Sequence, residues 1–306
     1  MISTESGADA PGRVHRARPG VSLTDAMLVT MAAIWGINIS VVKIGTQMLE
    51  PLAYNSIRVA LAAVSLLIIG ALGSRPWPAP RQVWTLLGLG VIGNGLYQVF
   101  FIEGIARTRA GSAALVLAAT PAFIALIGRA RGVERISSRG MLGIAISVGG
   151  IGLVVYGGVA HPADAGTLLG NLLVLAGSLC WAVFTVLLLP HTHQVDGIKL
   201  SALTLTGGAI PLLLLGAPAI AATAWSRVPA LAWGAILFSG IGALVIAYLF
   251  YYRGVRLLGP TRTAMYGNLQ PIIALFVAWL TLGETPTIWQ GLGAGSIMTG
   301  LLMTRM

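Results

Sequence analysis

Uncharged apolar runs are the feature that most constrains what this chain can fold into. Residues 83–102 carry no charge over the roughly 20 residues that a helix needs to cross a bilayer, and residues 236–252 approach that length. Of all 306 residues only 9% are charged, against about 25% in an ordinary soluble domain. A soluble protein built from so many apolar runs would lack a charged surface. The sequence therefore predicts an all-α membrane protein.

Ten spans fit the chain, and the connections between them are too short for a separate soluble domain. Residues 1–24 are polar and basic, and we interpret them as a disordered cytoplasmic tail rather than a signal peptide, because no apolar stretch precedes Leu23. The expected spans are residues 25–46, 52–73, 83–105, 110–128, 139–157, 167–189, 198–223, 231–253, 260–282 and 285–304.

The positions of the cations predict the orientation of these spans. With a cytoplasmic amino terminus, the inner connections hold fourteen Lys and Arg residues and the outer ones hold three. Both termini are then expected in the cytoplasm, with the protein in a bacterial inner membrane. The excess of 19 Lys and Arg over 9 Asp and Glu follows from this topology, so we expect lipid and no nucleic acid as its partner.

A long segment of the chain occurs twice. Residues 100–134 recur as residues 250–284, with Gly104 matching Gly254, Pro121 matching Pro271 and Glu134 matching Glu284. Residues 25–157 and 167–306 therefore read as two copies of one five-helix unit. Five spans per copy is an odd number, so the second copy would enter the membrane upside down. Such a 5+5 inverted repeat is characteristic of secondary transporters.

The start of each copy resembles a known family. The first copy opens with Trp-Gly-x-Asn, a Lys near the end of the same span, and a Pro and an Arg in the next; these residues are Trp35, Gly36, Asn38, Lys43, Pro51 and Arg58. The second copy keeps Trp181 and loses the others. This order resembles the EamA-like branch of the drug/metabolite transporter superfamily. The resemblance implies ten helices in an inverted repeat and export of small metabolites, and it extends to the bacterial exporters of aromatic amino acids.

Polar and aromatic side chains within the spans form the candidate path for a solute. Asn94, Tyr97, Gln98 and Phe101 stand at i, i+3, i+4 and i+7, so a regular helix places them on one face. Aromatic rings with a few amides and hydroxyls suit an amphipathic small molecule. The alternative interpretation is an interfacial aromatic belt with self-bonded hydroxyls. The candidate lining residues are Trp35, Asn38, Tyr97, Gln98, Phe101, Trp181, Thr185, Tyr248, Tyr251, Tyr266 and Gln270.

Two prolines are candidate hinges. Pro121 and Pro271 would free the carbonyls of Leu117 and Gly267, which could then face a substrate ammonium, or they could mark packing kinks only.

Three charged residues are candidates for a role in transport. Lys43 and Arg58 are candidates for binding a substrate carboxylate, with snorkelling or capping of helix ends as the alternative. Glu103 is the one acid placed to act as a proton relay, and it lies near a span end, so we expect facilitated export rather than carboxylate-proton coupling.

Other functional classes find less support in the sequence. No intramembrane His or Asp pair appears, which disfavours an intramembrane enzyme, and export of another solute or drug stays open. His191 and His193 are expected in a loop without a Cys or acid beside them, so no metal site and no cofactor are predicted. We expect a monomer rather than a dimer, with a small molecule as the substrate.

Overall fold

The chain is helical throughout the part that can be described. The computed structural model describes residues 22–133, 137–159 and 165–304, and no strand occurs among them. Of the predicted tail 1–24, residues 1–21 lie outside the described residues, as does Glu134 of the repeat. Ser22 caps the first helix: its hydroxyl accepts a hydrogen bond from the Asp25 amide, and the Asp25 carboxylate accepts one from the Ser22 amide.

Some helices of the bundle are single uninterrupted elements, such as α1 and α2, and others are composed of several shorter elements. The bounds are α1 (Leu23–Met48), α2 (Pro51–Leu72), α3 (Pro80–Gly90), η1 (Val91–Leu96), α4 (Tyr97–Arg107), α5 (Ala110–Leu117), α6 (Thr120–Ala130), α7 (Ser138–Val159), α8 (Ala165–Gln194), α9 (Gly197–Ala222), η3 (Trp225–Arg227), α10 (Ala230–Leu237), η4 (Phe238–Ile246), α11 (Ala247–Leu258), α12 (Pro260–Ala264), η5 (Met265–Asn268), α13 (Leu269–Leu282) and α14 (Ile288–Thr304).

The described helices confirm a multi-span membrane protein. Among the described residues, nine helical stretches are long and apolar enough to cross a bilayer, and four of them are composed of shorter elements, such as α3, η1 and α4 over Pro80–Arg107. Large apolar side chains face outward from the bundle: Leu72 is 84% exposed and Leu214 is 73% exposed. Such a surface is suited to lipid rather than to water. The last helix, α14, has 17 residues, which is at the lower end of the length that a membrane-spanning helix needs.

Several helix boundaries differ from the sequence expectation by one to five residues, and two of them have an identifiable local cause. The sixth span was expected to end at Leu189, but α8 continues through Pro190 to Gln194, so His191 and His193 lie in its last turn and not in a loop. One proline near a helix end removes a single hydrogen bond, and the helix can continue past it. The last span was expected from residue 285, but α14 begins at Ile288. There Thr287 and Gln290 cap each other's amides.

Irregular backbone occurs at matching places in the two copies. The π-helices η1 and η4 interrupt the third helix of the first copy and the corresponding helix of the second. The next helix is also interrupted in each copy, by Ala118 and Ala119 between α5 and α6, and by the 3-10 turn η5 between α12 and α13. Both interruptions directly precede the matched prolines Pro121 and Pro271.

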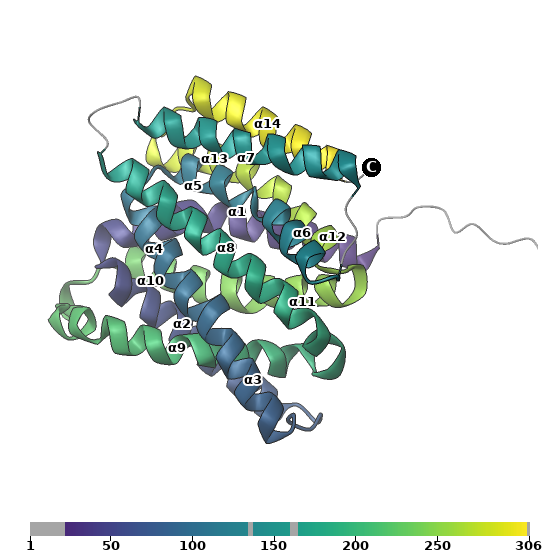
Figure 1. Cartoon of the computed structure of the whole chain (residues 1–306). Helices are drawn as coiled ribbons and strands as arrows, with labels where there is room; N and C mark the ends of the chain where they lie inside the picture. The colour runs from purple at the N-terminus through teal and green to yellow at the C-terminus, as the bar shows by residue number, and fades with distance from the viewer. Residues whose placement is uncertain (1–21, 134–136, 160–164, 305–306) are drawn as a thin grey trace, which may run out of the picture.

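The packing between the copies is reciprocal. Helix α4 packs on α8 while α11 packs on α1; α6 packs on α8 while α13 packs on α1; and η1 packs on α9 while η4 packs on α2. Two further pairs join equivalent helices, α2 with α9 and α7 with α14, and Figure 1 shows the latter pair side by side along one edge of the bundle. Reciprocal contacts of this kind are what a two-fold relation between two similar units produces.

The α7–α14 pair shows this reciprocity at single residues. A Cβ on Gly150 would lie 2.8 Å from the Gly293 carbonyl oxygen, and a Cβ on Gly293 would lie 2.8 Å from the Gly150 carbonyl oxygen. A Cβ on Gly300, the counterpart of Gly150, would collide with the carbonyl oxygen of Gly143, the counterpart of Gly293. The Ser147 hydroxyl donates to the carbonyl of Ile297, its own counterpart 150 residues on. Small residues therefore allow the two backbones to touch along this seam.

Candidate functional site

A cavity lies where the two copies meet. Its empty volume is about 740 Å³, open space at its mouth included, and its walls come from helices of both copies. The lining residues are Trp35, Asn38, Ile39, Arg58, Tyr97, Gln98, Phe101, Leu117, Ala118, Thr120, Pro121, Ile124, Trp181, Ala243, Leu244, Tyr248, Tyr251, Ala264, Gly267 and Gln270.

Aromatic rings form one continuous wall of this cavity. Trp181 is central: its ring centroid lies 5.1 Å from that of Tyr97, 5.3 Å from Tyr248, 5.4 Å from Tyr251 and 6.1 Å from Trp35. The Trp35 indole nitrogen donates a hydrogen bond of 3.0 Å to the Ala243 carbonyl, which fixes that ring against η4. The rings are tilted or edge-on to one another, as aromatic pairs prefer. They present an apolar surface with a fixed shape to whatever enters.

The π-helices decide which side chains of α4 and α11 reach the cavity. A π-helical turn contains more residues than an α-helical one, so it rotates the faces before and after it relative to each other. Asn94 lies in η1 and is buried but does not line the cavity, whereas Gln98 and Phe101 in α4 do. The single face predicted for Asn94, Tyr97, Gln98 and Phe101 is therefore wrong at Asn94, because the backbone is not a regular α-helix there.

Matched positions of the two copies meet inside the cavity. The Gln98 side-chain amide donates a 3.4 Å hydrogen bond to the Tyr248 hydroxyl, and these residues are counterparts 150 positions apart. At the interrupted helices, Leu117 and Thr120 line one wall while their counterparts Gly267 and Gln270 line another. The prediction of a bare Leu117 carbonyl is wrong, because that oxygen accepts a 2.6 Å hydrogen bond from the Thr120 hydroxyl. The short polar side chain caps the broken helix end.

Arg58 is the charged group of the cavity wall. Its side chain is 0% exposed, and its Nε donates to Asn55 Oδ1 at 2.9 Å while Nη2 donates to Gln98 Oε1 at 2.6 Å. The guanidinium carbon lies 5.8 Å from the centroid of the Tyr54 ring and 5.6 Å from that of Phe101. Its third nitrogen, Nη1, is buried and has no hydrogen-bond partner. Two neutral amide groups and two rings therefore surround a full positive charge.

A second polar network fixes the wall beside Asn38. The Ser239 hydroxyl donates to Asn38 Oδ1 at 2.6 Å and lies 2.8 Å from the Tyr54 hydroxyl. Tyr54 also donates to the Ala235 carbonyl at 3.1 Å. This network connects α1, α2 and the helix that contains η4, so Asn38 is held in one orientation.

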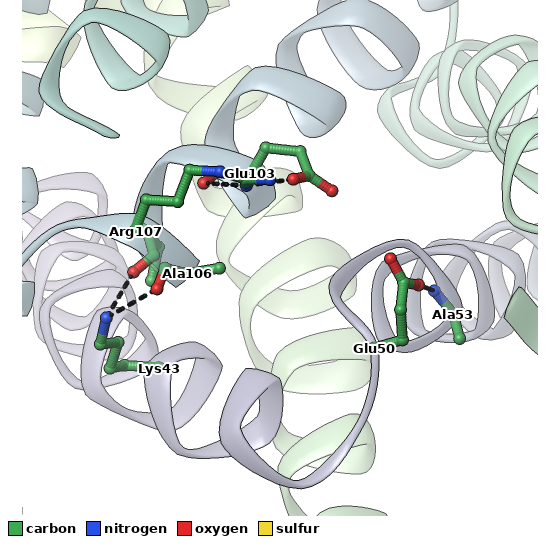
Figure 2. A network of polar contacts seen from close by, with 7 residues as sticks. Lys43, Glu50, Ala53, Glu103, Ala106 and Arg107 are labelled. Atoms are coloured by element: carbon green, nitrogen blue, oxygen red, sulfur yellow. Dashed lines mark hydrogen bonds and ion pairs between the residues drawn. The ribbon is translucent and has the colours of Figure 1, made fainter. Parts of the chain in front are cut away.

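Neither of the two remaining charged candidates, Lys43 and Glu103, lines the cavity. Figure 2 shows their polar contacts. The Lys43 ammonium donates to three carbonyls at the end of α4, those of Ile105 and Ala106 at 3.0 Å and Thr108 at 2.7 Å. It thereby neutralises the carbonyl end of that helix. Glu103 forms an ion pair with Arg107 one turn later on the same helix.

Three other predicted residues also lie outside the lining. Thr185 is buried beside the wall, 3.1 Å from the Tyr251 hydroxyl, and Tyr266 donates to the Asp25 carboxylate at the start of α1. Pro271 is buried in the first turn of α13.

Sequence reasoning missed apolar wall positions such as Ala118 and Ala243. The signal that was available for Ala118 is the repeat, because this residue lies just before a proline that recurs at the matching position, Pro271.

The fold is that of a multi-span membrane protein with an internal cavity. The family model for the EamA-like transporter family matches the chain twice, over residues 22–156 and 168–306. The chain belongs to this family.

The relatives agree with that assignment. The uncharacterized transporter YyaM of Bacillus subtilis is 25% identical over 281 residues, which cover 90% of this chain and 91% of YyaM. The uncharacterized inner membrane transporter YedA of Escherichia coli is 25% identical over 284 residues, covering 91% and 89%. A solved crystal structure shares the fold with a TM-score of 0.67 at 17% identity, over 93% of this chain and 99% of the other. The protein is therefore a membrane transporter of the EamA-like family.

Proposed function

We propose that this protein exports a small amphipathic solute, in the first place amino acids with aromatic or large apolar side chains, across a bacterial inner membrane. The observation that carries the proposal is the cavity between the two copies, walled by Trp35, Trp181, Tyr248 and Tyr251. Such a wall offers apolar contact over most of a solute, and Asn38 and Gln270 add amide groups. No catalytic step is part of this proposal.

We further propose that ten helices form two five-helix halves in opposite orientations, with both termini in the cytoplasm. The reciprocal packing of α4 on α8 and α11 on α1 supports a two-fold relation, and an odd number of spans per half makes that relation an inversion. Under such symmetry, a shape open to one side has a counterpart of similar energy open to the other side. The two shapes are the states that alternating access requires.

The interrupted helices are the places where the halves can move. The breaks at residues 118–119 and 265–268 lie in the cavity wall, and each is followed within a turn by a matched proline. Helices bend most readily where the backbone hydrogen-bond ladder is already broken. We propose that Pro121 and Pro271 are hinges and that a solute moves down its own gradient without a carboxylate proton relay.

Purified protein in proteoliposomes tests the export function. Saturable flux of phenylalanine or tryptophan that competes with other aromatic amino acids is the expected result. Flux of a different solute class alone would keep a transporter and reject this substrate, while a chemical change in an added compound would indicate an enzyme. A Trp181→Ala protein lacks the central ring and is expected to lose most of the flux. Size-exclusion analysis in detergent is expected to give a monomer.

A further inference from the structure

We propose that the cavity selects solutes with one net negative charge, a carboxylate or similar anion on an apolar body, and that the inside-negative membrane potential drives their exit. The inference rests on the proposed export of small amphipathic solutes, and among them it ranks monoanions above the zwitterionic amino acids. Its basis is Arg58, a fully buried guanidinium that has hydrogen bonds from two of its three nitrogens.

No protein carboxylate balances this charge among the described residues. Five acids are described there, and each is bound elsewhere: Asp25 by Ser22 and Tyr266, Glu50 by the Ala53 amide, Glu103 by Arg107, Asp196 by the Ile198 amide and Arg75, and Glu284 by the Ala110 and Gly111 amides. The described lining of the cavity contains no acid. A buried charge of this kind is normally paired.

The geometry of the guanidinium leaves one nitrogen for a ligand. Bonds from Nε to Asn55 and from Nη2 to Gln98 fix the plane of the group, and Nη1 then points at no protein acceptor. Because Arg58 lines the cavity, an oxygen of a bound solute can occupy this position. An anionic oxygen gives the charge-assisted bond that a buried guanidinium favours most.

A monoanion fits this wall better than a zwitterion does. A carboxylate neutralises the guanidinium, so the loaded cavity has no net charge in its low-dielectric surroundings. A zwitterion brings an ammonium into the same small space, where the described lining offers it no carboxylate and the Arg58 guanidinium repels it. A plain amine would add a second positive charge with no compensation.

The same charge balance gives export a driving force. An anion that leaves the cell without a coupled ion moves down an inside-negative potential. The distribution of a monovalent anion shifts about 50-fold for about 100 mV, which corresponds to about 2.3 kcal/mol per charge. No titrating acid in the cavity is needed for such export, since the potential itself supplies the work.

Three probes with the same phenyl ring test the proposal in proteoliposomes: 3-phenyllactate as the anion, phenylalanine as the zwitterion and phenethylamine as the cation. A potassium gradient with valinomycin sets the potential, and protein-free liposomes correct for leakage. We expect phenyllactate to move fastest and to approach a 50-fold distribution at about 100 mV. Phenylalanine should reach equal concentrations on both sides of the membrane at any potential.

This inference is overturned if phenylalanine moves faster than phenyllactate, or if phenyllactate flux does not depend on the potential. Either result leaves the proposed export intact. Flux of none of the three rejects the export of these solutes itself.

Substitutions assign the charge preference to Arg58. Glutamate has the same size as Gln98, whose Oε1 already accepts a hydrogen bond from Arg58. Gln98→Glu therefore places a protein carboxylate beside the guanidinium, which has none in the wild type. We expect it to lower the ratio of phenyllactate to phenylalanine flux about tenfold, with Arg58→Gln doing the same and Arg58→Lys keeping part of the preference. Arg256→Gln removes a cation from an exposed position at the end of α11 and should leave the ratio unchanged. If Arg58→Gln does not fold, Gln98→Glu decides alone. An unchanged ratio in a folded Gln98→Glu protein overturns the role of Arg58.

Discussion

Substitution of Gly150 by Ala tests the contact between the two halves where their backbones touch. A Cβ at this position would lie 2.8 Å from the Gly293 carbonyl oxygen and 2.9 Å from both Ile297 Cγ1 and Ser296 Cβ. Carbon atoms do not approach that closely, so α7 and α14 must separate. Overpacking of this kind costs roughly 1–3 kcal/mol. Alanine also favours a helix over glycine by about 1 kcal/mol, which opposes the loss.

The neighbouring residue provides a matched control. Gly149 lies in the same helix, is exposed, and has nothing within 4 Å of the position a Cβ would take. Gly149→Ala therefore gains the same helix propensity without the collision, and the difference between the two variants isolates the packing term. Thermal unfolding in detergent should place Gly149→Ala above the wild type and Gly150→Ala below Gly149→Ala by roughly 1–3 kcal/mol. Equal melting temperatures for the two variants would refute the close packing of α7 on α14.

Three further predictions concern the helix end, the aromatic wall and the hinges. Lys43→Met leaves the carbonyls of Ile105, Ala106 and Thr108 without the Lys43 ammonium as their donor. The protein should therefore lose roughly 1–3 kcal/mol of stability in the same unfolding assay. An unchanged melting temperature would contradict the capping role. Trp181→Phe keeps an aromatic ring, so it should raise the KM for an aromatic solute, whereas Trp181→Ala should abolish saturable flux. The same KM and maximal flux in the two variants would count against a ring-lined site. Pro121→Ala and Pro271→Ala each restore an amide donor near a helix break. Both variants should slow the maximal flux several-fold with little change in solute affinity. Wild-type rates in both variants would remove the hinges from the mechanism.

The membrane fold could be predicted because lipid permits few alternatives. A long uncharged run in such a chain must be a helix, which is why spans such as Pro260–Leu282 were placed correctly at both ends. Errors arose where local side-chain chemistry sets the boundary. The Thr287–Gln290 capping box delays α14 by three residues, and Pro190 does not end α8.

The cavity could be predicted only in part, for a reason that lies in the backbone. Regular helical spacing placed Gln98 and Phe101 together, but the π-helix η1 rotates Asn94 out of the same face, and no residue pattern announces that change. The surroundings of Arg58 were equally hidden. Its partner Gln98 is 40 residues away in sequence, so the pairing depends on how α2 and α4 pack.

Alternating access of the central cavity is the claim on which the account depends. Gln270 lines the cavity, and Cys180 is the one cysteine in the chain, so Gln270→Cys in a Cys180→Ser background provides a single reporter thiol. The measurement is its labelling rate by a membrane-impermeant reagent added to either face of oriented vesicles. We predict labelling from each face, a shift of the rates in opposite directions when a solute gradient is imposed, and protection by solute from both sides. Labelling from one face under every condition would contradict the account.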